Sequence, residues 1–229
     1  MKEAVQLCAY LIGLPLELMV IAALVRGEYR RYPFLFLYAV ADFLITVLEI
    51  QPALAYGTAS AADKKGWAIQ YWIHEQIMQV LVFLLVISLF YSAAKHLRPR
   101  RTILTAIVCG TVMVAAISFL AHYDVNMPWG RWMTRVTRDL NFCAAILLVG
   151  LWTMLISARQ KDYKLLMITG GLGIQFAGGA IGQALRDMSP AIVMAASDFT
   201  VITNLARLYI WWQALRVKSH SASHVVNTQ

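Results

Sequence analysis

Long runs of apolar residues, separated by short polar segments, dominate the hydrophobic pattern of this 229-residue chain. Seven runs hold enough apolar residues to cross a hydrocarbon core of about 30 Å as an α-helix. They cover residues 4–25, 33–55, 69–94, 102–122, 139–158, 164–185 and 191–215. The pattern predicts an all-α polytopic membrane protein, a seven-transmembrane-helix bundle. Residues 1–218 form its single domain, and residues 219–229 form a disordered cytoplasmic tail.

The start of the fifth run is the least sharply marked. Arg131, Arg135, Arg138 and Asp139 lie there, and we expect them to form an interfacial turn of helix.

Composition supports the membrane interpretation. The chain is 60% hydrophobic and 14% charged, whereas a soluble domain is roughly half apolar and about a quarter charged. A soluble helical bundle would need polar helix faces, which whole windows of about 20 residues lack here. The net charge of +8 does not indicate nucleic-acid binding, because the basic residues lie at the ends of the predicted helices. The lipid bilayer is the expected partner.

The basic residues also predict the orientation of the bundle. Twelve lysines and arginines lie in the first, third and fifth connections and the tail, against seven on the opposite side. Connections rich in lysine and arginine stay in the cytoplasm. We therefore expect the N-terminus outside and the C-terminus in the cytoplasm, with the protein in a bacterial inner membrane.

Four ionisable residues from three predicted helices share one level in the bundle: Glu49, His74, Glu75 and Asp198. At 1.5 Å per residue, this level lies about 8–11 Å below the outer boundary. Charges at this depth are costly unless they face water or the bundle interior, and they usually mark function. Tyr71, Glu75 and Gln79, spaced by four, form one stripe, and His74 points about 100° away. We predict an outward-opening pocket that binds a small molecule or a cation. Its lining residues are Glu49, Tyr71, Trp72, His74, Glu75, Gln79 and Asp198.

A second level of charge lies nearer the cytoplasm and consists of Glu17, Asp42, Asn204 and Arg207. An ion pair of Arg207 with Asp42 or Glu17, supported by Asn204, would lock the first, second and seventh helices together. Snorkelling of the guanidinium and a gating role are alternatives. Asp198 and Arg207 are nine residues apart and project to opposite sides, which favours two separate sites.

The sixth predicted helix contains six glycines, including a GxxxG spacing from Gly178 to Gly182. Such glycines allow two helix backbones to approach closely in lipid. Packing within the chain is the first interpretation, and a homodimer or a partner membrane protein on this face is the alternative.

Motifs for cofactor or catalytic chemistry are absent from the sequence. Cys8, Cys109 and Cys143 show no CxxC spacing, and no HExxH or GxSxG motif occurs. The seven-span, N-outside layout resembles that of rhodopsins, but residues 191–215 contain no lysine to form a retinal Schiff base. The chain otherwise resembles small uncharacterised bacterial seven-helix membrane proteins, a resemblance that implies a location but no activity. We expect no cofactor.

The leading functional hypothesis is a sensor or receptor-like module. The pocket would bind its ligand and relay a rearrangement of the bundle to the basic inner loops. A small proton-coupled secondary transporter is the second hypothesis. A membrane metalloenzyme that uses His74 and the carboxylates, and an assembly subunit, are the remaining ones, and whether any metal binds stays open.

Overall fold

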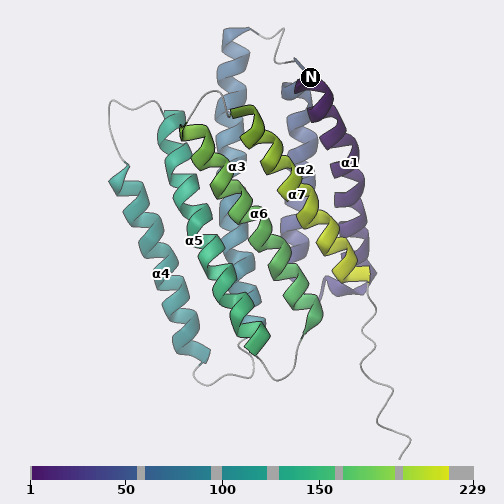
Figure 1. The fold of residues 1–229 in the computed structure, drawn as a ribbon, viewed down its shortest axis with the longest axis vertical. Coiled ribbons are helices and arrows are strands. Elements are labelled where there is room, and N and C mark those ends of the chain that lie inside the picture. The colour runs from purple at the N-terminus through teal and green to yellow at the C-terminus, as the bar shows by residue number, and fades with distance from the viewer. Residues whose placement is uncertain are drawn as a thin grey trace, which may run out of the picture.

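The structure is a computed structural model that describes residues 2–55, 60–93, 100–122, 129–157, 162–188 and 193–216. These residues form seven α-helices and contain no strand. The helices are α1 (Lys2–Ala23), α2 (Pro33–Ala55), α3 (Ala61–Ala93), α4 (Arg100–Ala121), α5 (Trp129–Ser157), α6 (Tyr163–Met188) and α7 (Val193–Arg216). A π-helical turn, η1 (Leu24–Glu28), follows α1. Successive helices run in opposite directions, so α1 begins and α7 ends at opposite ends of the bundle (Figure 1).

Two helices begin eight and ten residues earlier than the apolar runs predicted, while the other five begin within two residues of the predicted start. α3 starts at Ala61 instead of residue 69. The Ser60 hydroxyl accepts a hydrogen bond from the Asp63 backbone N–H, and the Asp63 carboxylate accepts one from the Ser60 backbone N–H. This reciprocal pair is a capping box at the start of the helix. α5 starts at Trp129 instead of residue 139. Trp132, Val136 and Leu140, spaced by four, are buried on one face, so this segment is amphipathic helix continuous with the span. The predicted tail, 219–229, lies outside the described residues.

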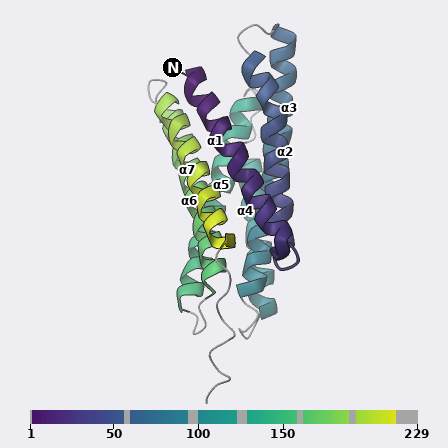
Figure 2. The same ribbon diagram turned by 90° about the vertical axis from the view of Figure 1, so that its right-hand side faces the viewer.

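Six helices form a closed ring, and α4 lies outside it. Contacts run from α1 to α2, α2 to α3, α3 to α5, α5 to α6, α6 to α7 and from α7 back to α1. α4 packs mainly against α5 and α3, at the edge of the bundle farthest from α1 (Figures 1 and 2). Ser118 and His122 of α4 hydrogen-bond to the Asp139 carboxylate of α5, at 2.9 and 2.8 Å.

Five of the described helices are long and apolar enough to cross a membrane. α4 has a shorter apolar stretch, Thr105–Ala121, and α7, which carries Asp198 and Arg207, does not reach the same threshold. Large apolar side chains are exposed on all seven helices, as expected where helices face lipid rather than water. Examples are Leu11, Leu44, Ile73, Leu120, Ile146, Ile181 and Ile202. The protein is a multi-pass membrane protein.

The dry core fills one end of the ring. Because neighbouring helices alternate in direction, the late parts of α1, α3, α5 and α7 meet the early parts of α2 and α6 there. Their buried side chains include Leu24, Leu35, Leu89, Leu151, Ile168 and Leu208. The other end of the ring contains most of the polar side chains discussed below.

The glycines of α6 pack against α7. A Cβ added at Gly178 would lie 2.4 Å from the Thr203 Cγ2 atom, and one at Gly182 would lie 2.5 Å from the Thr200 hydroxyl. Both glycines are buried. This face is therefore occupied within the chain, as the first interpretation of the GxxxG spacing expected. A homodimer stays a prediction, and it would need another surface.

Candidate functional site: a polar cavity inside the helix ring

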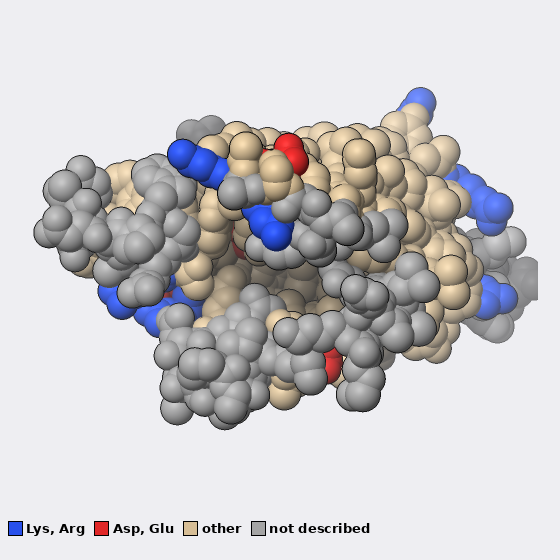
Figure 3. Space-filling view, turned by 90° about the horizontal axis from the view of Figure 1, so that it is seen from above, with Lys and Arg blue, Asp and Glu red and all other residues tan. Residues whose placement is uncertain are grey.

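A cavity of about 360 Å³ lies inside the ring above the dry core. Residues of α2, α3, α5, α6 and α7 line it. They are Tyr38, Asp42, Ile45, Thr46, Glu49, Tyr71, His74, Glu75, Met78, Gln79, Val82, Asn141, Gln175, Phe176, Gly179, Gln183, Thr200, Val201 and Asn204. Viewed from the end at which the chain starts, the described surface is hollowed near its centre (Figure 3). A volume of this size suits a small ligand.

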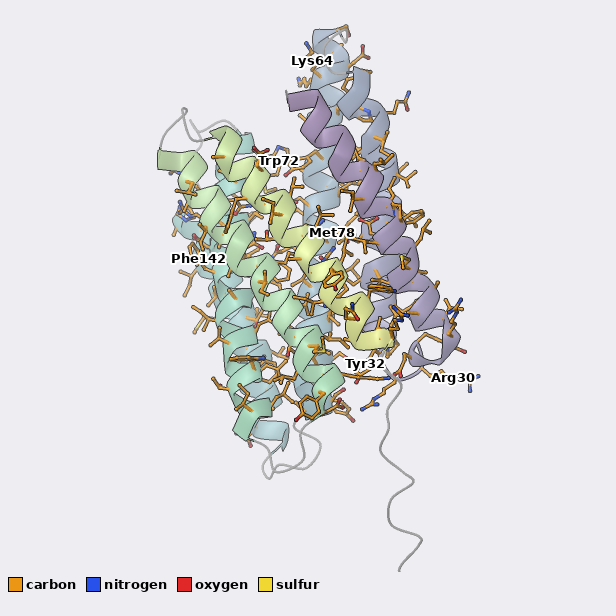
Figure 4. All side chains as sticks on the ribbon, turned by 45° about the vertical axis from the view of Figure 1, so that its right-hand side comes forward. Arg30, Tyr32, Lys64, Trp72, Met78 and Phe142 are labelled. Carbon is orange, nitrogen blue, oxygen red and sulfur yellow. The ribbon has the colours of Figure 1, made fainter. Side chains whose placement is uncertain are left out.

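Each helix presents one face to the cavity. On α2 the lining residues recur every three or four positions from Tyr38 to Glu49, with one adjacent pair, and on α3 they do so from Tyr71 to Val82, with two adjacent pairs. Such spacing follows one side of an α-helix, and the stripe is about 100° wide or more. His74 and Glu75 both fit within that width, although they are adjacent in sequence. Met78 lies at mid-height within the bundle, below Trp72 (Figure 4).

The outer part of the cavity joins a histidine to a carboxylate. The His74 Nδ1 atom lies 3.3 Å from the Glu49 Oε1 atom, with the two side chains 12% and 33% exposed. Glu75 lines the same cavity. The structure thus brings three residues of the predicted outer level into one space, from two helices.

The floor of the cavity is a buried arginine network. The Arg207 Nη2 atom donates to the Asp42 Oδ2 atom at 2.5 Å, and Nη1 donates to the Tyr38 hydroxyl at 2.7 Å and to the Gln175 Oε1 atom at 2.9 Å. Arg207 is fully buried and lies over the Trp211 ring, with 4.8 Å from guanidinium carbon to ring centroid. A buried guanidinium needs these partners, because an unpaired charge in the interior is strongly destabilising. The network therefore separates the polar cavity from the apolar core.

The predicted inner ion pair forms with Asp42, not with Glu17. Glu17 is buried on α1 and accepts from the Thr46 hydroxyl at 3.2 Å through Oε1, while Oε2 has no hydrogen-bond partner among the described residues. Asn204 lines the cavity, and its Oδ1 atom accepts no hydrogen bond from Arg207. Asp42 and Asn204 share the cavity with Glu49 and Glu75, so the expectation of two separate sites is wrong in this respect.

Two predicted lining residues lie elsewhere. Trp72 packs edge-to-face on Tyr71, with ring centroids 5.2 Å apart, and is not among the residues that line the cavity. Asp198 does not line it either. It is half-buried, and it lies three residues before the lining residue Val201 and four before the exposed Ile202. The number of residues from the end of a span gives the height of a side chain in the bundle, but it does not say to which side of the helix that side chain points.

The sequence interpretation missed the neutral polar residues of α5 and α6 that line the cavity: Asn141, Gln175 and Gln183. Asn141 and Gln183 lie 3.5 Å apart, between Nδ2 and Oε1. The signal was present, because each of these amides interrupts an apolar run of a predicted span. The prediction started from charged residues at a common depth and took uncharged residues only from the helices that carry those charges, and none of these charges lies on α5 or α6.

Two cavity amides have unsatisfied atoms. Gln79 is 5% exposed, and its Nε2 atom has no hydrogen-bond partner among the described residues. The Asn204 Oδ1 atom is likewise unpartnered there. Buried polar atoms in native proteins are nearly always hydrogen-bonded, so these two atoms are groups of the lining that a bound polar molecule could satisfy.

A second group of charges joins the connection after α1 to the start of α6, at the end opposite the cavity mouth. Lys164 pairs with Glu28 at 2.5 Å, and Arg31 pairs with Asp162 at 2.5 Å. Tyr32 is buried beside them, and burial raises the pKa of its hydroxyl to about 12. Figure 4 shows Tyr32 beneath the end of α7 and Arg30 pointing away from the bundle. These pairs hold the end of α1 and the starts of α2 and α6 together.

Within the described part of the chain, no group of three or more histidine, cysteine, aspartate or glutamate side chains is placed to hold a metal ion. His74 and Glu49 are the nearest approach to such a group in the cavity. A search against protein-family models, curated proteins and solved structures found no match for this chain.

Proposed function

We propose that the protein is a seven-span, receptor-like module of a bacterial inner membrane that recognises a small polar ligand or cation from the outer side. The observation that carries this proposal is a polar cavity lined by five helices, above a dry core that fills the other end of the ring. A ligand can enter such a cavity from one side only. Recognition is therefore favoured over passage in this conformation.

The proposed seven spans include α4 and α7. α7 completes the ring between α6 and α1, and α4 packs along α5. The polar residues of α7 that lower its hydropathy include Asn204 and Arg207, which face the interior, while Ile202 and Tyr209 are exposed. Lysine and arginine enrichment at the end where α7 finishes supports a cytoplasmic C-terminus.

A signal would reach the cytoplasmic end through the ring. Ligand contacts on α3 and α7 would shift the helices that meet at the Arg207 network. The ion pairs of Glu28 with Lys164 and of Arg31 with Asp162 connect two helices of this network, α2 and α6, to the end of α1 at the proposed inner surface. A ligand can bias such an arrangement only through a difference in affinity between two states.

A cavity-filling substitution tests the proposal. Gly179 lines the cavity, and its nearest neighbour would be the Asn141 Nδ2 atom, 3.7 Å from an added Cβ. The unfolding temperature of the detergent-solubilised full chain is measured with a panel of small ammonium ions, amides, sugars and carboxylates. We expect at least one class to raise it in the wild type, because a ligand that binds only the folded state stabilises that state. In Gly179→Leu the rise should be lost.

Gly173→Leu is the matched control, since Gly173 lies on the same helix, does not line the cavity and has no atom within 4 Å of an added Cβ. It should respond as the wild type does. A panel without any response, or a response that survives Gly179→Leu, would contradict the proposed function.

A proton-coupled transporter is the second candidate. The observation that favours it is Glu17, whose buried carboxyl has one oxygen without a partner among the described residues. Glu17 lies on α1, which packs against α2 and α7, the helices of the Asp42–Arg207 pair. Buried carboxyls of this kind serve as proton sites in transporters. Uptake of a panel solute by reconstituted vesicles in response to an imposed pH gradient would support this candidate, and binding without uptake would support the receptor.

A further inference from the structure

We infer that the cavity takes a small organic ammonium ion that also carries a hydrogen-bond acceptor, the chemical class of the amino alcohols. Its ammonium group would lie against the carboxylates of Glu49 and Glu75, and its acceptor against the amide nitrogen of Gln79. This inference rests on the proposed function and specifies the ligand.

The charge of the lining selects a cation. Asp42, Glu49 and Glu75 contribute carboxylates, His74 is the only basic side chain, and no lysine or arginine lines the cavity. Arg207 lies behind the floor, fully buried against Asp42, Tyr38 and Gln175. An anion, or the carboxylate of a zwitterion, would have only His74 to pair with, and His74 already lies 3.3 Å from the Glu49 carboxylate. Repulsion between like charges is strong at this depth because the surroundings have a low dielectric constant.

The unpartnered amide of Gln79 adds a second requirement. Its Nε2 atom is a donor, the side chain is 5% exposed, and the residue lines the cavity. A ligand that fills the space without offering an acceptor would leave this donor unsatisfied. Asn204 on the facing helix α7 has an unpartnered Oδ1 atom, which can accept the proton of a ligand hydroxyl.

The spacing along α3 limits the size of the ligand. Gln79 follows Glu75 by four residues, so the two side chains share a face and are separated by about 6 Å along the helix axis. A chain of about three carbons between ammonium and hydroxyl spans that separation within the reach of a hydrogen bond at each end. Met78 and Phe176 provide apolar contacts for such a chain.

The lining also disfavours a quaternary ammonium ion. Quaternary ammonium groups are held by cages of aromatic rings. Three aromatic residues line this cavity: Tyr38, Tyr71 and Phe176. Tyr38 packs against Trp211, at 5.8 Å between ring centroids, and holds Arg207 through its hydroxyl, and Tyr71 packs edge-to-face on Trp72. Carboxylates and amides instead suit an ammonium group with N–H bonds to donate.

The test uses a matched series of probes on the detergent-solubilised full chain, with affinity measured by calorimetry and by the unfolding temperature. The probe 3-amino-1-propanol carries both groups, and butylamine replaces its hydroxyl with a methyl group. The trimethylammonium analogue of 3-amino-1-propanol removes the N–H donors, 1,3-propanediol removes the charge, and 4-aminobutanoate adds an anion. We expect 3-amino-1-propanol to bind most tightly, and butylamine to bind roughly tenfold more weakly, as one lost hydrogen bond implies.

Three variants locate the groups responsible. Glu75→Gln should weaken the binding of 3-amino-1-propanol roughly tenfold or more. Gln79→Leu should remove the difference between this probe and butylamine. Asp198→Asn, which changes a carboxylate outside the cavity, should leave binding unchanged. The unfolding temperature without probe reports whether each variant is folded, and if Glu75→Gln does not fold, the order of the probes on the wild type decides.

Equal affinity for butylamine and 3-amino-1-propanol, tighter binding of the diol or of 4-aminobutanoate, or loss of binding in Asp198→Asn would overturn the inference. If another solute class stabilises the protein and Gly179→Leu abolishes that effect, the proposed function stands and this inference fails. If no solute of any class stabilises the protein, both fail.

Discussion

Arg207 carries a positive charge into a fully buried position, and the residues around it determine whether that charge is tolerated. Asp42 supplies the counter-charge at 2.5 Å, and Tyr38 and Gln175 accept from the other terminal nitrogen. The Nε atom has no partner among the described residues. Buried pairs are held against a large desolvation cost, so removing one member harms stability more than removing both.

Breaking this pair should cost roughly 3–5 kcal/mol of unfolding free energy, since Asp42→Asn leaves a buried guanidinium without its anion. The double variant Asp42→Asn with Arg207→Met should lose less than the sum of the two single losses, because it removes both charges. Titration of unfolding with a denaturing detergent, followed by circular dichroism, measures all four members of the cycle.

Arg31 and Asp162 are the control pair, because their side chains are 52% and 33% exposed. Asp162→Asn keeps the side-chain oxygen that caps the Leu165 backbone N–H and should cost no more than about 1 kcal/mol. If the losses of unfolding free energy from the Asp42 and Arg207 substitutions are additive, or if Asp162→Asn costs as much as Asp42→Asn, the buried pair does not stabilise the protein in the way described.

Part of this residue-level picture could be predicted from the sequence. Depth counting paired Arg207 with a carboxylate on a neighbouring helix, because a charge so far from both ends of a span requires a partner. It could not choose between Asp42 and Glu17, and it placed Asp198 in the pocket, because it contains no information on helix rotation. Tyr38 and Gln175 carry no charge, so depth counting did not single them out.

At the scale of elements, the contact of α6 with α7 depends on glycine. Gly171, Gly178 and Gly182 all face α7, where an added Cβ would meet Trp211, Thr203 and Thr200 respectively. Thr203 is buried and β-branched, so its side chain has few other rotamers available within a helix. The two helices would have to move apart to accept a larger residue at Gly178.

Gly178→Ala should therefore lower the unfolding free energy by about 1–3 kcal/mol through overpacking. Gly173→Ala, on the same helix, meets no atom within 4 Å and should be neutral or stabilising by up to about 1 kcal/mol. The same detergent titration compares the two. If both substitutions have equal effects, the close approach of α6 and α7 is not what these glycines provide.

Helix ends show where hydropathy is informative and where it is not. The bounds of α2 agree with the predicted 33–55, because its apolar run and its helix coincide. α3 and α5 begin well before their apolar runs. α3 begins at the Ser60–Asp63 capping box, and α5 begins with an amphipathic segment that buries Trp132 and Val136. Both signals were present in the sequence, but neither raises the mean hydropathy of a window.

At the scale of the whole molecule, the ring determines where the cavity can lie. α3 contacts α5 directly, and α4 is displaced to the outside. The sequence predicted seven helices and their alternation, but not this order, because connection lengths alone do not indicate which helices meet. The ring brings the polar faces of five helices together at one end and their apolar faces together at the other.

The same division explains why the two predicted charge levels share one space. Asp42 and Glu49 are seven residues apart on α2, about 10 Å along the axis, and the cavity spans that distance. The apolar half begins below Arg207, with Leu208 and Trp211 in the core.

The most direct test of the account is a cysteine scan along α3 in intact cells, with a membrane-impermeant thiol reagent and with Cys8, Cys109 and Cys143 replaced. A thiol reacts as the thiolate, which forms in water and not in lipid. We predict labelling from the outer side at the cavity-lining positions Tyr71, His74, Glu75, Met78, Gln79 and Val82, and none at the lipid-facing positions Ile73, Ile77, Val80 and Leu84. Labelling of both faces alike, or labelling of the cavity positions from the cytoplasmic side only, would contradict a polar cavity open to the outside.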